Sequence, residues 1–152
     1  WYQRRVRDLC GNQKSLPQLF NAVVNEIIYQ RKVHDLKYFV TRKEANVIIH
    51  EVQLSATCDY IEQNCKQIAD WSIQQAIDNI QIKILDRFTQ QIVETWYFKL
   101  MYGENSYELE LKDLISKILT QCLNKPVSAK VVFDISMGVS KSIQLNDQWK
   151  KE

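Results

Sequence analysis

The chain of 152 residues has little glycine and proline and no strong excess of charge of either sign. With 3 glycines and 2 prolines, it lacks the glycine-rich loop that cradles phosphates in nucleotide-binding proteins. Its net charge of +2 comes from interspersed acids and bases, which give no strong field to attract duplex DNA or an anionic membrane. We therefore expect neither nucleic acid nor a membrane as a direct partner.

No apolar run approaches the about 18 to 20 residues that a membrane-spanning helix needs, and no charged-then-apolar leader opens the chain. The 4 cysteines form no C-x-x-C pair, so they are typical of small core residues in a reducing compartment. We expect a soluble protein of the nucleus, the cytoplasm or both.

Motifs for catalysis and metal binding are also missing. The two histidines, His34 and His50, have no cysteine or carboxylate at ligand spacing. There is no G-x-S-x-G, no phosphate-binding loop and no H-E-x-x-H. We expect no cofactor, no metal and no catalysis, although a hydrolase site assembled from distant residues remains an alternative.

Three segments carry the period of an amphipathic helix. In the first, residues 16–31, apolar side chains fill half of the wheel and Gln18, Asn21, Asn25 and Glu26 fill the polar half. Ser15 is its predicted N-cap, with Pro17 in the first turn. The others are 54–72, with apolar positions spaced four and three apart and Ser55 as a possible cap, and 106–124, closed by Pro126.

Strands are predicted from alternation. Residues 79–85 and 91–102 alternate on either side of a turn at 86–90, so they predict an antiparallel hairpin. Glu94 falls on the apolar side of the second strand, near its start, where we expect solvent to reach it. Further strands are predicted at residues 129–137 and 142–149, and a short strand or extended arm at 47–52. Near the start of the chain, a solvated basic arm is predicted from Arg4, Arg5, Arg7 and Lys14. The fold class is α+β, with three helices packed on one face of a largely antiparallel sheet, in a single domain over residues 1–152.

Several short motifs, in this order and spacing, resemble the HORMA domain family. Asn25-x-Ile27-x-Tyr29-Gln30-Arg31 and Glu94-Thr95-Trp96-Tyr97-Phe98 are similar to its spindle-checkpoint member, whereas Tyr60-Ile61-x-Gln63 is closer to the accessory subunit of a translesion DNA polymerase. Val33-His34-Asp35-Leu36 departs from the family's tight turn ending in Tyr-Pro.

The resemblance implies a non-catalytic adaptor that binds the short closure-type peptide of a partner protein by strand addition. The pathways implied are DNA repair by translesion synthesis, or spindle-checkpoint control of the cell cycle, with meiotic members also known. The expected receptor edge is Val131 to Met137, through Val131, Phe133, Ile135 and Met137.

A second candidate surface is the exposed face of the third helix, with Lys112, Ser116, Lys117 and Thr120. The family commonly carries a dimer-interface arginine there, where this chain has Ser116 followed by Lys117, so arginine-centred dimerisation is in doubt. A homodimer or a heterodimer with another HORMA protein stays open.

The resemblance also bears on the last residues. In peptide-clamping members, a mobile safety belt of several tens of residues follows the last strand, and this sequence stops at Glu152, where that belt would begin. We expect a belt that is truncated or missing from the sequence, or a beltless member. The beltless alternative implies a scaffold that heterodimerises in autophagy initiation.

Overall fold

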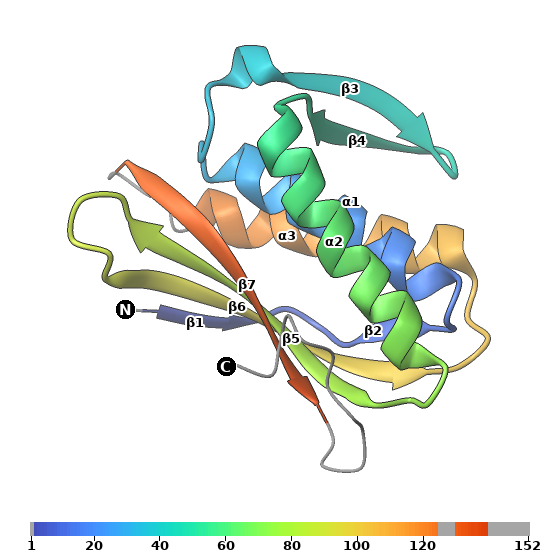
Figure 1. The fold of residues 1–152 in the computed structure, drawn as a ribbon. Coiled ribbons are helices and arrows are strands. Elements are labelled where there is room, and N and C mark those ends of the chain that lie inside the picture. Colours follow the sequence, from blue (N-terminus) through green and yellow to red (C-terminus); the bar gives the residue numbers. More distant parts are fainter. Residues whose placement is uncertain (1, 125–129, 140–152) are drawn as a thin grey trace.

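A computed structural model describes residues 2–124 and 130–139. Three helices cover one face of a five-stranded sheet, and a separate two-stranded sheet lies beyond the helices (Figure 1). The α+β class and the packing of three helices on a sheet are confirmed. The strand predicted at residues 142–149 lies outside the described residues.

The main sheet has the strand order β1-β6-β5-β7, and β2 also pairs with β6. The pairing of β5 with β6 is antiparallel as predicted, and β5 also pairs in antiparallel fashion with β7. The short strands β1 and β2 run parallel to β6 and were not predicted, so the sheet is mixed. Its strands are β1 (Tyr2–Arg5), β2 (Leu9–Gly11), β5 (Ile77–Asp86), β6 (Ile92–Tyr102) and β7 (Val131–Val139).

All three predicted helices are present, as α1 (Ser15–Gln30), α2 (Ser55–Ser72) and α3 (Tyr107–Asn124). The most buried of them is α1, which packs against α2, α3 and β4. Its predicted cap was wrong, because Ser15 begins the helix. The side chain of Asn12 instead accepts hydrogen bonds from the N–H groups of Lys14 and Ser15, each at 2.9 Å.

The segment between α1 and α2 contains a short 3₁₀ helix, η1 (Leu36–Tyr38), and the hairpin β3 (Phe39–Glu44) and β4 (Val47–Val52). Only β4 was predicted. The hairpin covers the polar half of α1, so Asn25 and Glu26 are 3% and 1% exposed instead of solvated. Asn25 accepts a hydrogen bond from the N–H of Val52 at 2.9 Å, and Glu26 lies 3.0 Å from Nδ1 of His50.

A buried ionic cluster joins β1, α1 and β6, and it corrects two predictions. Glu94 is 3% exposed and its carboxylate accepts from Nε of Arg4 at 3.0 Å, from Nε of Arg31 at 2.7 Å and from Nε1 of Trp96 at 2.8 Å. Arg4 also donates to Gln121 of α3 at 2.7 Å. Glu94 is thus shielded from solvent, and Arg4 belongs to the core instead of a solvated arm, because each compensates the charge of the other.

Candidate functional site

The strand β7 forms one edge of the main sheet. In the part of the chain that the structure describes, it pairs only with β5. Its opposite edge therefore presents backbone N–H and C=O groups that no other described strand uses, which is the arrangement that accepts an added strand. This edge coincides with the receptor segment expected from the sequence.

The register on β5 decides which backbone groups face outward. Ile135 lies opposite Ile82, and its N–H donates away from β5, to the hydroxyl of Tyr60 at 2.9 Å. Antiparallel ladders alternate between pairs that exchange hydrogen bonds and pairs that do not. The outward backbone groups therefore belong to Val131, Phe133, Ile135 and Met137.

The side chains of the same four residues point toward the helices. Val131 and Ile135 are 1% and 4% exposed, while Phe133 and Met137 are half-buried and pack against the core. Between them, Asp134 is exposed. A strand added at this edge would meet the backbone of these residues and the exposed parts of Phe133 and Met137, which could select its side chains.

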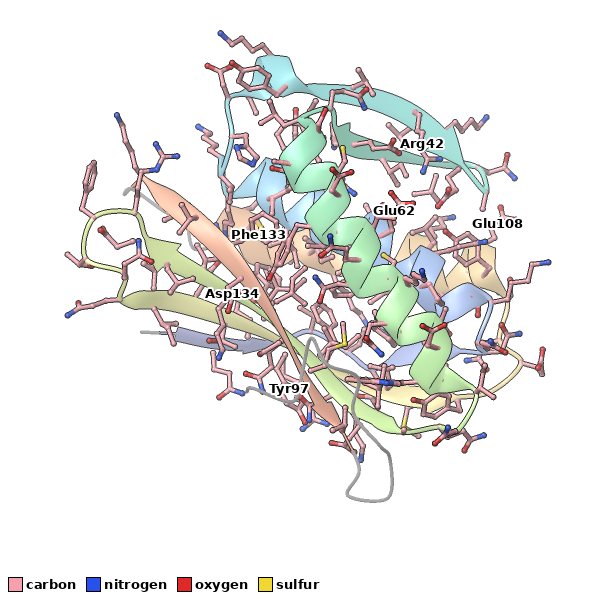
Figure 2. All side chains as sticks on the ribbon, in the orientation of Figure 1. Arg42, Glu62, Tyr97, Glu108, Phe133 and Asp134 are labelled. Atoms are coloured by element: carbon pink, nitrogen blue, oxygen red, sulfur yellow. The ribbon has the colours of Figure 1, made fainter. Side chains whose placement is uncertain are left out.

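Tyr60, on α2, reaches across to this edge. Its ring makes an edge-on contact with Phe133, with centroids 5.7 Å apart, and its hydroxyl donates to Oδ1 of Asp134 at 3.0 Å. Phe133 and Asp134 lie one after the other along β7 (Figure 2). Tyr60 is therefore a side chain of α2 that contacts the middle of the edge strand.

Sequence reasoning did not place Tyr60 in the site. The helical face predicted for α2 was defined by its apolar residues only. A second set of residues on the helix, which starts at Tyr60 and continues at intervals of four, three and four residues, was not considered. Three members of this set are buried, and two of those are polar amides. The set consists of Tyr60, Asn64, Gln67 and Trp71. A helical spacing that includes polar residues was the available signal.

The second candidate surface lies elsewhere on the molecule. Lys112, Ser116, Lys117 and Thr120 are all exposed on α3, as expected. The ammonium of Lys117 is 3.2 Å from Asp113, and the hydroxyl of Thr120 donates to the carbonyl of Ser116 at 3.0 Å. Since α3 packs against α1, β2 and β4, the fold does not bring this face together with the outer edge of β7.

An open hollow of about 320 Å³ lies between α1, α2 and the hairpin. The guanidinium of Arg42 is hydrogen-bonded there to both Glu44 and Glu51. The nearby residue Cys65 is half-buried, and burial raises the pKa of its thiol to about 12. The charges of Arg42, Glu44 and Glu51 are therefore paired with one another. The thiol of Cys65 stays protonated at neutral pH, whereas a nucleophile requires the thiolate.

Within residues 2–124 and 130–139, no three metal-ligating side chains of the histidine, cysteine or carboxylate type gather in one place. None of the described helices has the length and apolar character that would allow it to cross a membrane.

A family model, the HORMA domain, matches residues 13–145. The chain belongs to this family. The match covers all three helices, the hairpin β3–β4 and the strands β5, β6 and β7. The domain is thus a HORMA domain whose described edge strand falls inside the matched segment.

Among relatives, this HORMA chain is 23% identical over 128 residues to the mitotic spindle checkpoint component MAD2 of Saccharomyces cerevisiae. The alignment covers 82% of this chain and 65% of the yeast protein. The chain therefore spans less than two thirds of the length of that relative.

Solved structures of other proteins share the fold. A chain in a crystal structure of the mitotic checkpoint complex superposes with a TM-score of 0.81 at 19% identity, covering 90% of this chain and 79% of its own length. C. elegans HTP-2, bound to a closure motif of HTP-3, superposes with a TM-score of 0.65 at 12% identity, covering 88% and 68%. At these identities the likeness concerns the HORMA fold alone.

Proposed function

We propose that this HORMA domain is a non-catalytic adaptor that binds a short, extended segment of a partner protein as an additional strand on β7. The observation that carries the proposal is the outer edge of β7, where the backbone groups of four alternate residues face away from β5. Main-chain hydrogen bonds at such an edge supply affinity, and the side chains beside it supply specificity. Such an edge serves a protein that joins other proteins into a complex and does not itself catalyse a reaction.

The relatives favour a place for this adaptor in checkpoint control of the cell cycle over translesion synthesis or autophagy initiation. The yeast relative is named a mitotic spindle checkpoint component, and a similar chain stands in the mitotic checkpoint complex. The similar HTP-2 is bound to a closure motif, which supports a peptide partner here too. We also propose that a second HORMA protein binds this chain, with the exposed face of α3 as the candidate surface. The proposed location is the nucleus or the cytoplasm.

The experiment uses peptides selected from a random phage library on the purified chain. Their dissociation constants are then measured by calorimetry for two variants, Met137→Pro and Met137→Ala. Both variants lose the same side chain, but only proline removes the outward N–H and fills its place with a ring. Since Met137 lies at the outer edge, proline leaves the pairing with β5 intact.

We expect the selected peptides to bind Met137→Ala and to bind Met137→Pro at least tenfold more weakly. In the complex with the unmodified chain, the amide of Met137 should also exchange with solvent more slowly. Equal binding to the two variants would place the peptide elsewhere and contradict strand addition. Recovery of no binding peptide at all would count against the adaptor function.

A further inference from the structure

The middle of the β7 edge is already hydrogen-bonded by a side chain of the same domain. The hydroxyl of Tyr60 accepts from the N–H of Ile135 at 2.9 Å and donates to the carboxylate of Asp134 at 3.0 Å. We propose that Tyr60 is a built-in cap of this edge, which an incoming strand must displace before it can pair with Ile135. This inference rests on the proposed function, because the cap regulates the same binding edge.

The cap and a bound strand compete for one donor. A backbone N–H supplies a single hydrogen atom, and an added strand would place a carbonyl oxygen about 2.9 Å from that nitrogen. The oxygen of Tyr60 now lies at this distance from the nitrogen of Ile135, on the side away from β5. One of the two oxygens must therefore leave, and the hydroxyl can leave because it sits at the tip of a side chain.

The two bonds of the hydroxyl fit its chemistry. A phenolic group donates one hydrogen bond and accepts others, and here the carboxylate of Asp134 takes the hydrogen while the backbone N–H fills a lone pair. A hydrogen bond to a charged acceptor is stronger than one between neutral groups. The ring contact with Phe133 also holds the hydroxyl over the edge. The cap therefore contacts the backbone of Ile135, the carboxylate of Asp134 and the ring of Phe133 together.

Capping protects the domain while it is free. An exposed edge strand is a template for unwanted pairing with other chains, and proteins commonly block such edges with side chains or covering segments. On the described edge, the backbone group that Tyr60 caps is the N–H of Ile135. A specific partner that pairs along the whole edge gains several backbone hydrogen bonds, so it can displace a cap that occupies one N–H. The cap lowers the affinity of any partner strand that pairs with Ile135.

The variant Tyr60→Phe isolates the hydroxyl, because the ring that packs on Phe133 is kept. Tyr102→Phe is the matched control. The hydroxyl of Tyr102 is also hydrogen-bonded to strand backbone, donating to the carbonyl of Ile77 at 2.8 Å, but it does so on β5, away from the outer edge of β7. The hydroxyl of Tyr102 also accepts from the N–H of Ile77 at 3.2 Å. Both variants therefore lose one tyrosine hydroxyl that is hydrogen-bonded to strand backbone, but only Tyr60→Phe frees the outer edge of β7.

Two readouts are measured on the three proteins. In the free state, we expect the amide of Ile135 to exchange with solvent faster in Tyr60→Phe than in the unmodified chain or in Tyr102→Phe. With a peptide selected as above, we expect Tyr60→Phe to bind roughly two- to tenfold more tightly, the factor that corresponds to the net free energy of one hydrogen bond. Tyr102→Phe should bind as the unmodified chain does.

Equal or weaker binding of the peptide to Tyr60→Phe would overturn the cap, since the hydroxyl would then be neutral or would contact the partner. Unchanged exchange of the Ile135 amide would overturn it as well. If the peptide bound Met137→Pro and Met137→Ala equally, the proposed function would fail. The cap would then fail too, because no partner strand would pair at the edge that Tyr60 occupies.

Discussion

At the scale of single residues, Glu94 is a buried charge that holds β1, the end of α1 and β6 together. Its carboxylate accepts hydrogen bonds from Arg4, Arg31 and Trp96 and is itself 3% exposed. Burying an ion pair adds little net stability, but removal of one member leaves the other charge in the core without compensation. The stability of the fold therefore depends on this carboxylate because it neutralises two buried guanidinium groups.

Glu94→Gln is therefore expected to lower the free energy of unfolding by about 3 to 5 kcal/mol, because two buried arginines lose their counterion. Urea denaturation followed by circular dichroism measures the change. Glu62→Gln, which neutralises an exposed carboxylate on α2, should stay within about 0.5 kcal/mol of the unmodified chain. Equal effects of the two substitutions would contradict the role of the buried cluster.

A second prediction at this scale concerns pH and Cys122. The thiol is 7% exposed, and burial raises its pKa from 9.0 to about 11. The unfolded chain therefore releases this proton first, so the stabilising contribution of the thiol is complete below pH 9 and is lost as pH rises toward 11. Comparison with Cys122→Ala isolates this contribution from other groups that titrate in alkali.

The difference in unfolding free energy between the unmodified chain and Cys122→Ala should shrink by about 1 to 2 kcal/mol between pH 8 and pH 10.5. Denaturation curves at both pH values measure it. A constant difference would show that the folded thiol titrates as it does in the unfolded chain.

At the scale of elements, the hairpin β3–β4 is held by a turn that its sequence fits poorly. Ala45 and Asn46 both have positive φ, 47° and 63°, the backbone of a tight hairpin turn that favours glycine and asparagine. Alanine is strained in this region. Ala45→Gly should therefore raise the free energy of unfolding by about 0.5 to 1 kcal/mol.

The same substitution in a regular helix gives the opposite sign. Ala69 lies inside α2, where glycine is less favourable than alanine by about 0.5 to 1 kcal/mol. Thermal unfolding of Ala45→Gly and Ala69→Gly tests both signs at once. If both variants lost stability, the packing of the Ala45 methyl group would outweigh the relief of strain.

The elements that could be predicted from the sequence are those whose own side chains repeat a period. Strands β5 and β6 are 10 and 11 residues long and alternate in burial at residues 80–84 and 96–100, and each helix has an apolar face. The strands β1 and β2 have 4 and 3 residues, too few for a periodic signal. Arg4 is buried because of Glu94, 90 positions away, and no local pattern carries that information.

The candidate site could be predicted in part for the same reason. The alternation of β7 indicated which side chains turn inward, and those residues also present the outward backbone groups. The contact from Tyr60 depends on how α2 lies against β7, 75 positions away in the chain. Only the packed structure could reveal it.

At the scale of the whole molecule, stability should be distributed unevenly between the two sheets. The main sheet and α1 enclose a core of fully buried side chains such as Phe20, Trp96 and Phe98. The hairpin β3–β4 contributes few buried side chains, chiefly Ile49 and Val52, and a two-stranded sheet alone is marginal in water. It therefore depends on α1 for its stability.

We expect native-state hydrogen exchange, followed by mass spectrometry, to show residues 39–52 opening at a lower free energy than residues 77–100. Asn25→Ala should widen the gap, because the N–H of Val52 loses its acceptor on α1 at a cost of about 1 to 3 kcal/mol. The N–H groups within β5 and β6 should keep their protection in this variant. If the two regions opened at one common free energy, the hairpin would belong to the cooperative core, and its contact with α1 would be as strong as the pairing of the main sheet.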